Sequence, residues 1–178
     1  VKANKIDCVR LLAEAGAELR AKPDSDGKTA LNLAWERGNQ NGEIVSVLAK
    51  PDIVGPKLRE LEARCAEGSI PAEEAQAFLG WLIDSDGKYL AHMPEEEAEF
   101  VRLLVEGAGV AALDFQDPQH QGRTALLRAL EAKRIGLFQA LLDAGADPLL
   151  SGADGRDCLF LAAENPVFFA RAHSAITL

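Results

Sequence analysis

Residues 122–148 read GRTALLRALEAKRIGLFQALLDAGADP, a segment whose glycines and proline mark out one structural unit. Gly122 suits a turn because glycine tolerates a positive φ, and Thr124 follows as the cap of a short helix. Apolar residues then recur at helical spacing through the second half of the segment. Gly145 ends that second helix in a left-handed conformation, and Pro148 prevents its continuation. The segment therefore predicts a turn, two helices and a loop.

Parts of this segment recur elsewhere in the chain. The pentapeptide GRTAL of residues 122–126 matches GKTAL at residues 27–31, and a weaker copy, GRDCL, begins at Gly155, 33 residues after the first. The closing LLDAGADP resembles LLAEAGAE at residues 11–18. Recurrence at a fixed spacing of this size is typical of repeat proteins, in which stacked units bury faces that no unit can bury alone.

The pattern G-x-T-A-L, two helices and L-L-x-x-G-A-D at a 33-residue period resembles the ankyrin repeat. The resemblance implies an all-α helical solenoid of helix-turn-helix units, with β-hairpin or turn fingers between them. We expect a single ankyrin-repeat domain over residues 1–178. Its units are expected at residues 1–22 (partial), 23–53, 54–83 (degenerate), 84–118, 119–151 and 152–178 (capping).

Residues 54–83 depart furthest from the repeat pattern, because they contain neither G-x-T-x-L nor G-A-D. They still carry two apolar stripes at helical spacing, one through Leu61 and one through Phe78. We interpret them as a degenerate helical pair that continues the stack. A break over residues 50–56, which would separate two ankyrin blocks, is the alternative.

Prolines predict shortened helices in two of the other units. Pro94 closely follows the segment GKYLAH (residues 87–92) and suits the first position of a new helix. Pro166 is expected to end the first helix of the last unit early. Glu95–Glu97 are then expected at a solvated helix start, where the helix dipole favours acids. Phe168 and Phe169 are candidates for an exposed apolar edge.

The composition excludes several classes of function. The 178 residues include 19 Lys+Arg and 28 Asp+Glu, a formal net charge of −9. Without a basic stripe, the chain is not expected to bind nucleic acid or anionic membranes, and its apolar runs are too short for membrane insertion. Three widely spaced cysteines without a C-x-x-C pair fit a reducing compartment. We therefore expect a cytoplasmic protein, or an exported one if a signal peptide has been removed.

No cofactor, metal site or catalytic site is predicted. The two D-S-D-G segments, at residues 24–27 and 84–87, lack the carboxylates that a calcium loop needs at its first and twelfth positions. Residues 107–109 (GAG) end a predicted helix and do not follow a strand, so they are not a phosphate loop. His92 stands where the ankyrin family places a structural histidine. No Ser/His/Asp or Cys/His arrangement can be proposed, and we expect no enzymatic activity.

The ankyrin resemblance implies a non-catalytic protein–protein interaction module or scaffold, which binds its partner through finger and first-helix residues on a concave face. The acidity of the chain favours a basic partner, because opposite charges speed encounter. The alternative is an acidic neutralising protein, of the immunity or inhibitor type, that binds a basic toxin or enzyme. Alone, the chain is expected to be a monomer. The candidate contact residues, carried over unit by unit, are Ser25, Asp26, Lys28, Glu36, Arg37, Ser85, Asp86, Lys88, His120, Gln121, Arg123, Glu131, Ala153, Asp154 and Arg156.

Overall fold

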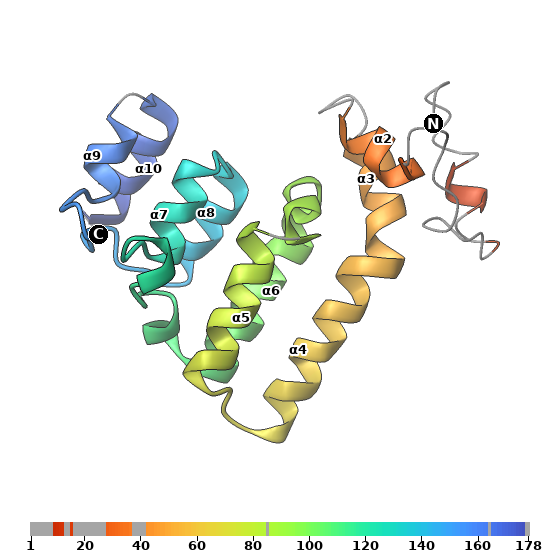
Figure 1. Cartoon of the computed structure of the whole chain (residues 1–178), viewed down its shortest axis with the longest axis horizontal. Helices are drawn as coiled ribbons and strands as arrows, with labels where there is room; N and C mark the ends of the chain where they lie inside the picture. The colour runs from red at the N-terminus through yellow and green to blue at the C-terminus, as the bar shows by residue number, and fades with distance from the viewer. Residues whose placement is uncertain are drawn as a thin grey trace. The chain divides into compact units, whose positions relative to one another are not determined.

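The structure of the chain is a computed structural model that describes residues 9–12, 15, 28–36, 42–84, 86–163 and 165–176 (Figure 1). The chain divides into two compact units, Val1–Arg59 and Glu60–Leu178. The described residues are mostly helical and contain no β-strand, which confirms the expected all-α fold. Within these residues, no helix is both long enough and apolar enough to cross a membrane. A single domain over the whole chain stays a prediction.

In the first unit, the helices α2 (Ala30–Glu36) and α3 (Gly42–Ala49) pack against each other. The side-chain oxygen of Thr29 accepts a hydrogen bond from the backbone N–H of Asn32 at 3.2 Å. The threonine of the GKTAL segment therefore caps a helix, as the repeat pattern predicts. The buried residues of the two helices are Leu31, Ala34, Ile44, Val45, Leu48 and Ala49.

The segment that follows α3 is also helical. A π-helical turn (Lys50–Val54) leads directly into α4 (Gly55–Glu67). Pro51 has no backbone N–H to donate, and a wide turn accommodates that loss. Gly55 donates to the carbonyl oxygen of Lys50, and a Cβ at position 55 would lie only 2.9 Å from that oxygen. Glycine is therefore needed where the π turn returns to α-helix, and this segment is not an extended linker.

The second compact unit, Glu60–Leu178, is a stack of helices in two layers (Figure 1). Helices within each layer contact one another, α5 with α7 and α7 with α9 in one layer, and α6 with α8 and α8 with α10 in the other. A 3₁₀ helix (Asp86–His92) stands in place of a full first helix before Pro94, which confirms the predicted shortening. The α-helices are α5 (Ala72–Asp84), α6 (Pro94–Ala108), α7 (Ala125–Glu131), α8 (Ile135–Asp143), α9 (Cys158–Ala162) and α10 (Pro166–Ile176).

The two helices predicted for residues 54–83 are present as α4 and α5. Leu61 of α4 and Phe78 of α5 are buried, in keeping with the two apolar stripes. Phe78 and Trp81 both contact the ring of Phe100 in α6, at centroid distances of 6.1 and 5.4 Å. These ring contacts hold the degenerate unit against the next one, because an aromatic pair contributes stability beyond that of burying its apolar surface.

The unit over residues 119–151 has the predicted turn, two helices and loop. Gly122 and Gly145 both adopt a positive φ, of 66° and 94°. Thr124 is the N-cap of α7, and its side chain accepts a hydrogen bond from the N–H of Leu127 at 3.4 Å. The same role is played in the last unit by Asp157, which accepts from the N–H of Phe160 at 2.8 Å. These local predictions are confirmed because each depends on neighbours within one helical turn.

One expectation about the start of α6 is wrong. Glu97 is not solvated with its neighbours: it is 2% exposed and forms an ion pair with Arg134, which is itself 8% exposed. Arg134 also donates a hydrogen bond to the backbone carbonyl of Leu82, at the end of α5. Burial raises the pKa of Glu97, and the charge and hydrogen bond of Arg134 oppose that rise. A charged cluster thus joins three consecutive units inside the core.

The expectation of an exposed Phe168–Phe169 edge is wrong for the first of these residues. Phe168 is 2% exposed, and its ring meets that of Phe138 edge to face at 5.1 Å. Phe169 is 42% exposed, and its ring lies against the imidazole of His173. Adjacent positions on a helix face different directions, so only one of the pair can point at α8.

We expect Cys158 to be chemically inert in the folded protein. Burial raises the pKa of its thiol to about 12, with smaller contributions from Asp157 and Asp147. Because the thiolate is the reactive form, iodoacetamide at about pH 8 should label Cys158 only after the protein is unfolded in urea. Peptide mass spectrometry measures this. Equal labelling rates in native and unfolded protein would contradict the expectation.

Candidate functional site

The turn that precedes α7, residues 117–123, is tightly closed, and we call it a finger. The backbone N–H of Asp117 bonds to the carbonyl of Arg123 at 3.2 Å, and the N–H of Gly122 bonds to the carbonyl of Asp117 at 2.8 Å. The carboxylate of Asp117 accepts hydrogen bonds from the N–H of Gln119 at 2.8 Å and from Nδ1 of His120 at 2.6 Å. A turn held by backbone and side-chain bonds presents its outer residues in a fixed orientation.

Two successive fingers contact each other. The N–H of Ala153 donates to the carbonyl of Gln121 at 2.8 Å. The guanidinium of Arg123 reaches both carboxylate oxygens of Asp154, at 3.1 and 3.0 Å, in a bidentate pair. Asp154 also accepts a bond from the N–H of Arg156 at 3.1 Å. The structure therefore brings together candidate residues from the last two units that the sequence placed in separate repeats.

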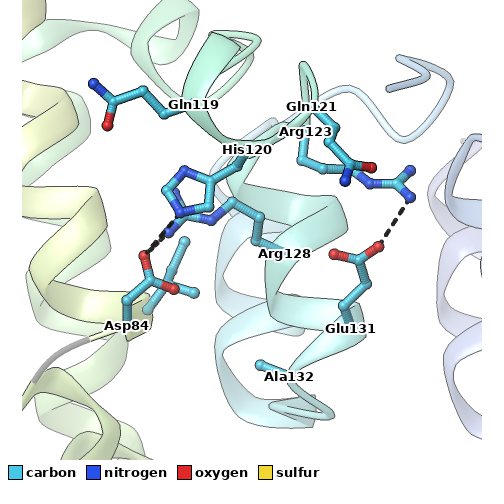
Figure 2. Close-up of a pocket in the computed structure, with 9 residues that line it drawn as sticks. Asp84, Gln119, His120, Gln121, Arg123, Arg128, Glu131 and Ala132 are labelled. Atoms are coloured by element: carbon cyan, nitrogen blue, oxygen red, sulfur yellow. Dashed lines mark ion pairs between the residues drawn. The ribbon is translucent and has the colours of Figure 1, made fainter. Parts of the chain in front are cut away.

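A cleft of about 430 Å³ opens beside the first of these fingers, and we call it the finger cleft. It lies between the end of α5, the finger and the outer part of α7 (Figure 2). Its lining contains four of the candidate residues, His120, Gln121, Arg123 and Glu131. The complete lining is Ile83, Asp84, Gln119, His120, Gln121, Arg123, Arg128, Glu131 and Ala132.

Two arginines form ion pairs along the walls of the finger cleft. Arg128 is 8% exposed and pairs with Asp84 at the end of α5. Arg128 also forms an ion pair with Asp117, whose Oδ2 is 3.6 Å from Nη1 of the arginine. On the other wall, Nη2 of Arg123 is 3.1 Å from Oε1 of Glu131. Figure 2 shows His120 and Arg128 turned toward Asp84, and Arg123 turned toward Glu131.

Two carboxylates beside the finger cleft, Asp117 and Asp154, have lowered pKa values. Burial raises the pKa of Asp117, but hydrogen bonds from His120 and Gln119 outweigh it and hold that pKa below its ordinary value. The N–H of Arg156 and the charge of Arg123 lower the pKa of Asp154. Asp84, Asp117, Glu131 and Asp154 pair with Arg123, Arg128 and Arg156, so four carboxylates stand against three guanidinium groups. The side chains of Asp84 and Glu131 are 46% and 44% exposed, open to an entering cation.

The other candidate residues are not brought to this cleft by the described structure. Lys28 precedes α2 and is half-buried, and Glu36 ends α2 with its side chain outside what is described. Asp86 and Lys88 lie in the 3₁₀ helix, again without described side chains. The predictions outside the described residues are Ser25, Asp26, Arg37 and Ser85.

Sequence reasoning missed Asp84, Gln119 and Arg128 as cleft residues. Asp84 is the first residue of the second D-S-D-G segment, of which the repeat pattern marks only later positions as contact candidates. Arg128 stands alone among apolar residues in TALLRAL, and a single charge on an otherwise apolar short helix is a signal of a buried partner. That signal does not reveal the partner, because Asp84 comes from another unit.

The described residues offer no metal site, since no group of three or more His, Cys, Asp or Glu within them is arranged to hold an ion. His92 is half-buried in the 3₁₀ helix, and burial lowers the pKa of its imidazole. This placement agrees with a structural histidine.

Comparison with known proteins gives one family match. A family model described as ankyrin repeats (many copies) matches residues 1–49. No curated protein and no solved structure matches the chain significantly. The matched segment includes the GKTAL copy, which recurs as GRTAL at the entrance of α7.

Proposed function

We propose that this chain binds a partner protein through the finger cleft, because residues 1–49 match the ankyrin-repeat family model and such repeats generally serve as protein–protein interaction modules. Binding requires no catalysis. The remaining finger and first-helix candidates belong to the same proposal, since they occupy equivalent positions in their units. They are Ser25, Asp26, Lys28, Glu36, Arg37, Ser85, Asp86, Lys88, Ala153, Asp154 and Arg156.

The observation that carries this proposal is the pair of half-exposed carboxylates on the walls of the finger cleft, Asp84 and Glu131. Asp84 and Glu131 stand on opposite walls, and the two arginines are already paired behind them. A lysine or arginine side chain of the partner, entering the cleft, gains charge-assisted hydrogen bonds to both carboxylates. A partner carboxylate would instead be repelled by the exposed oxygens of Asp84 and Glu131. The partner surface is therefore expected to be basic.

The finger cleft is suited to binding because its walls are held in place before a partner arrives. The bonds within the finger and the bidentate pair of Arg123 with Asp154 leave few side chains to be ordered on binding. Preorganisation of this kind raises affinity, since each ordered side chain otherwise costs about 0.5–1.5 kcal/mol.

We expect the double variant Asp84→Asn with Glu131→Gln to lose its partner. The substitutions keep side-chain size and remove two negative charges, so the affinity should fall at least about ten-fold. The partner is first recovered from native lysate with the wild-type chain and identified by mass spectrometry. Its affinity for each variant is then measured by titration calorimetry.

The matched control is Glu62→Gln with Glu73→Gln, which removes two charges from exposed positions of α4 and α5 outside the cleft. This control should bind like the wild type. Equal losses in both double variants would show a general charge effect and overturn the assignment to the cleft. Recovery of no stoichiometric protein partner would overturn the function itself.

A second candidate is a neutralising protein that inhibits a basic toxin or enzyme, and the same pair of carboxylates favours it. In that case the recovered partner has an activity that the chain suppresses, and binding weakens as salt screens the charges. Affinity unchanged between low and high salt would count against this candidate.

A further inference from the structure

A second depression, of about 420 Å³, lies between α6 and the later turns of α8, and we call it the α6–α8 groove. It shares no lining residue with the finger cleft. Its apolar floor consists of small side chains from both helices. They are Ala98, Val101, Val105, Ala140 and Ala144.

Most of the side chains on the floor of the α6–α8 groove are at least partly exposed to solvent. Val101 is buried, whereas Ala98 is exposed and Val105, Ala140 and Ala144 are half-buried. Small side chains on two neighbouring helices leave a channel into which the ridge of a third helix can pack. The residues of α6 along the groove run from Glu95 to Glu106, about 16 Å at 1.5 Å per residue. That length fits a helix of about three turns.

The rim of the α6–α8 groove is acidic. Four carboxylates border it, from Glu95, Glu99, Glu106 and Asp143, against the single guanidinium of Arg102. Arg102 is held within the rim, because Nη2 lies 2.5 Å from Oε1 of Glu99 and the group also pairs with Glu106. The rim therefore carries a net negative charge that its only arginine does not balance.

We propose that the α6–α8 groove is a second docking surface, which takes an amphipathic basic helix of a partner protein. The apolar face of that helix, with residues at i, i+3, i+4 and i+7, lies on the alanine and valine floor. Lysines and arginines that flank this face meet Glu95, Glu106 and Asp143. A second copy of this chain is a poor occupant, because its net charge of −9 brings further negative charge to an acidic rim.

The test uses the full ¹⁵N-labelled chain and a synthetic peptide of about 15 residues, with leucines at i, i+3, i+4 and i+7 and lysines at the flanking positions. The amide signals of Ala98, Ala140 and Ala144 should shift saturably, and those of His120 and Arg123 should not. A peptide with glutamates in place of the lysines should bind at least about ten-fold more weakly. A peptide with the same residues in scrambled order, which lacks an apolar face, should weaken equally.

Two variants connect the binding to the groove. Ala98→Trp fills the floor at an exposed position and should weaken the lysine peptide at least about ten-fold, while Ala63→Trp, on the exposed face of α4, should not. Glu95→Lys with Glu106→Lys reverses the rim and should switch the preference to the glutamate peptide.

Several results would overturn the proposal. These are shifts confined to the finger cleft, equal binding by Ala98→Trp and Ala63→Trp, equal affinity for the lysine and glutamate peptides, or no binding of the lysine peptide. Concentration-dependent dimerisation that Ala98→Trp abolishes would assign the groove to a second copy instead.

Discussion

Arg134→Ala is expected to lower the free energy of unfolding by about 3–5 kcal/mol. Arg134 forms an ion pair with Glu97 and donates to the carbonyl of Leu82, and both charged side chains are almost fully buried. Removing the guanidinium leaves a carboxylate in the core without its cation, and the cost of an uncompensated buried charge is large. Urea denaturation followed by circular dichroism measures the loss.

The matched control is Arg102→Ala, because Arg102 also pairs with glutamates but is 52% exposed. Solvent screens such a pair, so its loss should cost far less stability than the loss of Arg134. Replacing the buried pair together, by Arg134→Met with Glu97→Leu, should recover most of the stability, since no charge is then buried. Equal losses for Arg134→Ala and Arg102→Ala would mean that the buried pair does not hold the units together.

The Arg134→Ala variant should also lose stability as the pH rises. Burial raises the pKa of Glu97 above its ordinary value of 4.5, and the charge and hydrogen bond of Arg134 oppose that rise. The variant lacks both of these opposing effects. A carboxyl group whose folded-state pKa is raised binds protons more tightly when folded, so the folded state is favoured at low pH. The variant should therefore be less destabilised near pH 4 than at about pH 7.

Phe138→Ala should cost about 3–5 kcal/mol and loosen the last unit before the rest of the stack. Phe138 is 0% exposed, and its ring forms the edge-to-face contact with Phe168 of α10. The substitution removes transfer free energy and leaves a cavity between α8 and α10. Because the pair α9 and α10 lies at the end of the stack and packs on α7 and α8, it should open first.

Hydrogen exchange of the α10 amides, together with urea denaturation, measures this effect. The control is Phe160→Ala in α9, where the ring is 63% exposed and lies under the guanidinium of Arg156 at 5.2 Å. That change should cost less than about 1 kcal/mol. Unchanged protection of α10 in Phe138→Ala, or an equal loss in Phe160→Ala, would contradict the expected role of the aromatic contact.

The candidate site could be predicted only in part. His120, Gln121, Arg123 and Glu131 follow from the position of the finger in the repeat, and all four line the finger cleft. Asp84 does not follow from that position, because it begins the unit expected at residues 84–118 and meets α7 only when the units stack. Which predicted residues contact a partner stays a prediction, tested by the charge-removing variants.

By itself, the sequence determined the helices, their caps and their stops. Thr29, Thr124 and Gly145 act on backbone groups within one turn of themselves, so their roles can be predicted from local spacing alone. The tertiary structure alone decided which acids are buried and which are free for binding. Arg134 reaches Glu97 and Leu82 across 37 and 52 residues of chain, and no local pattern distinguishes Glu97 from its solvated neighbours. A charge is buried or exposed according to the elements that pack over it, and that packing is a property of the assembled stack.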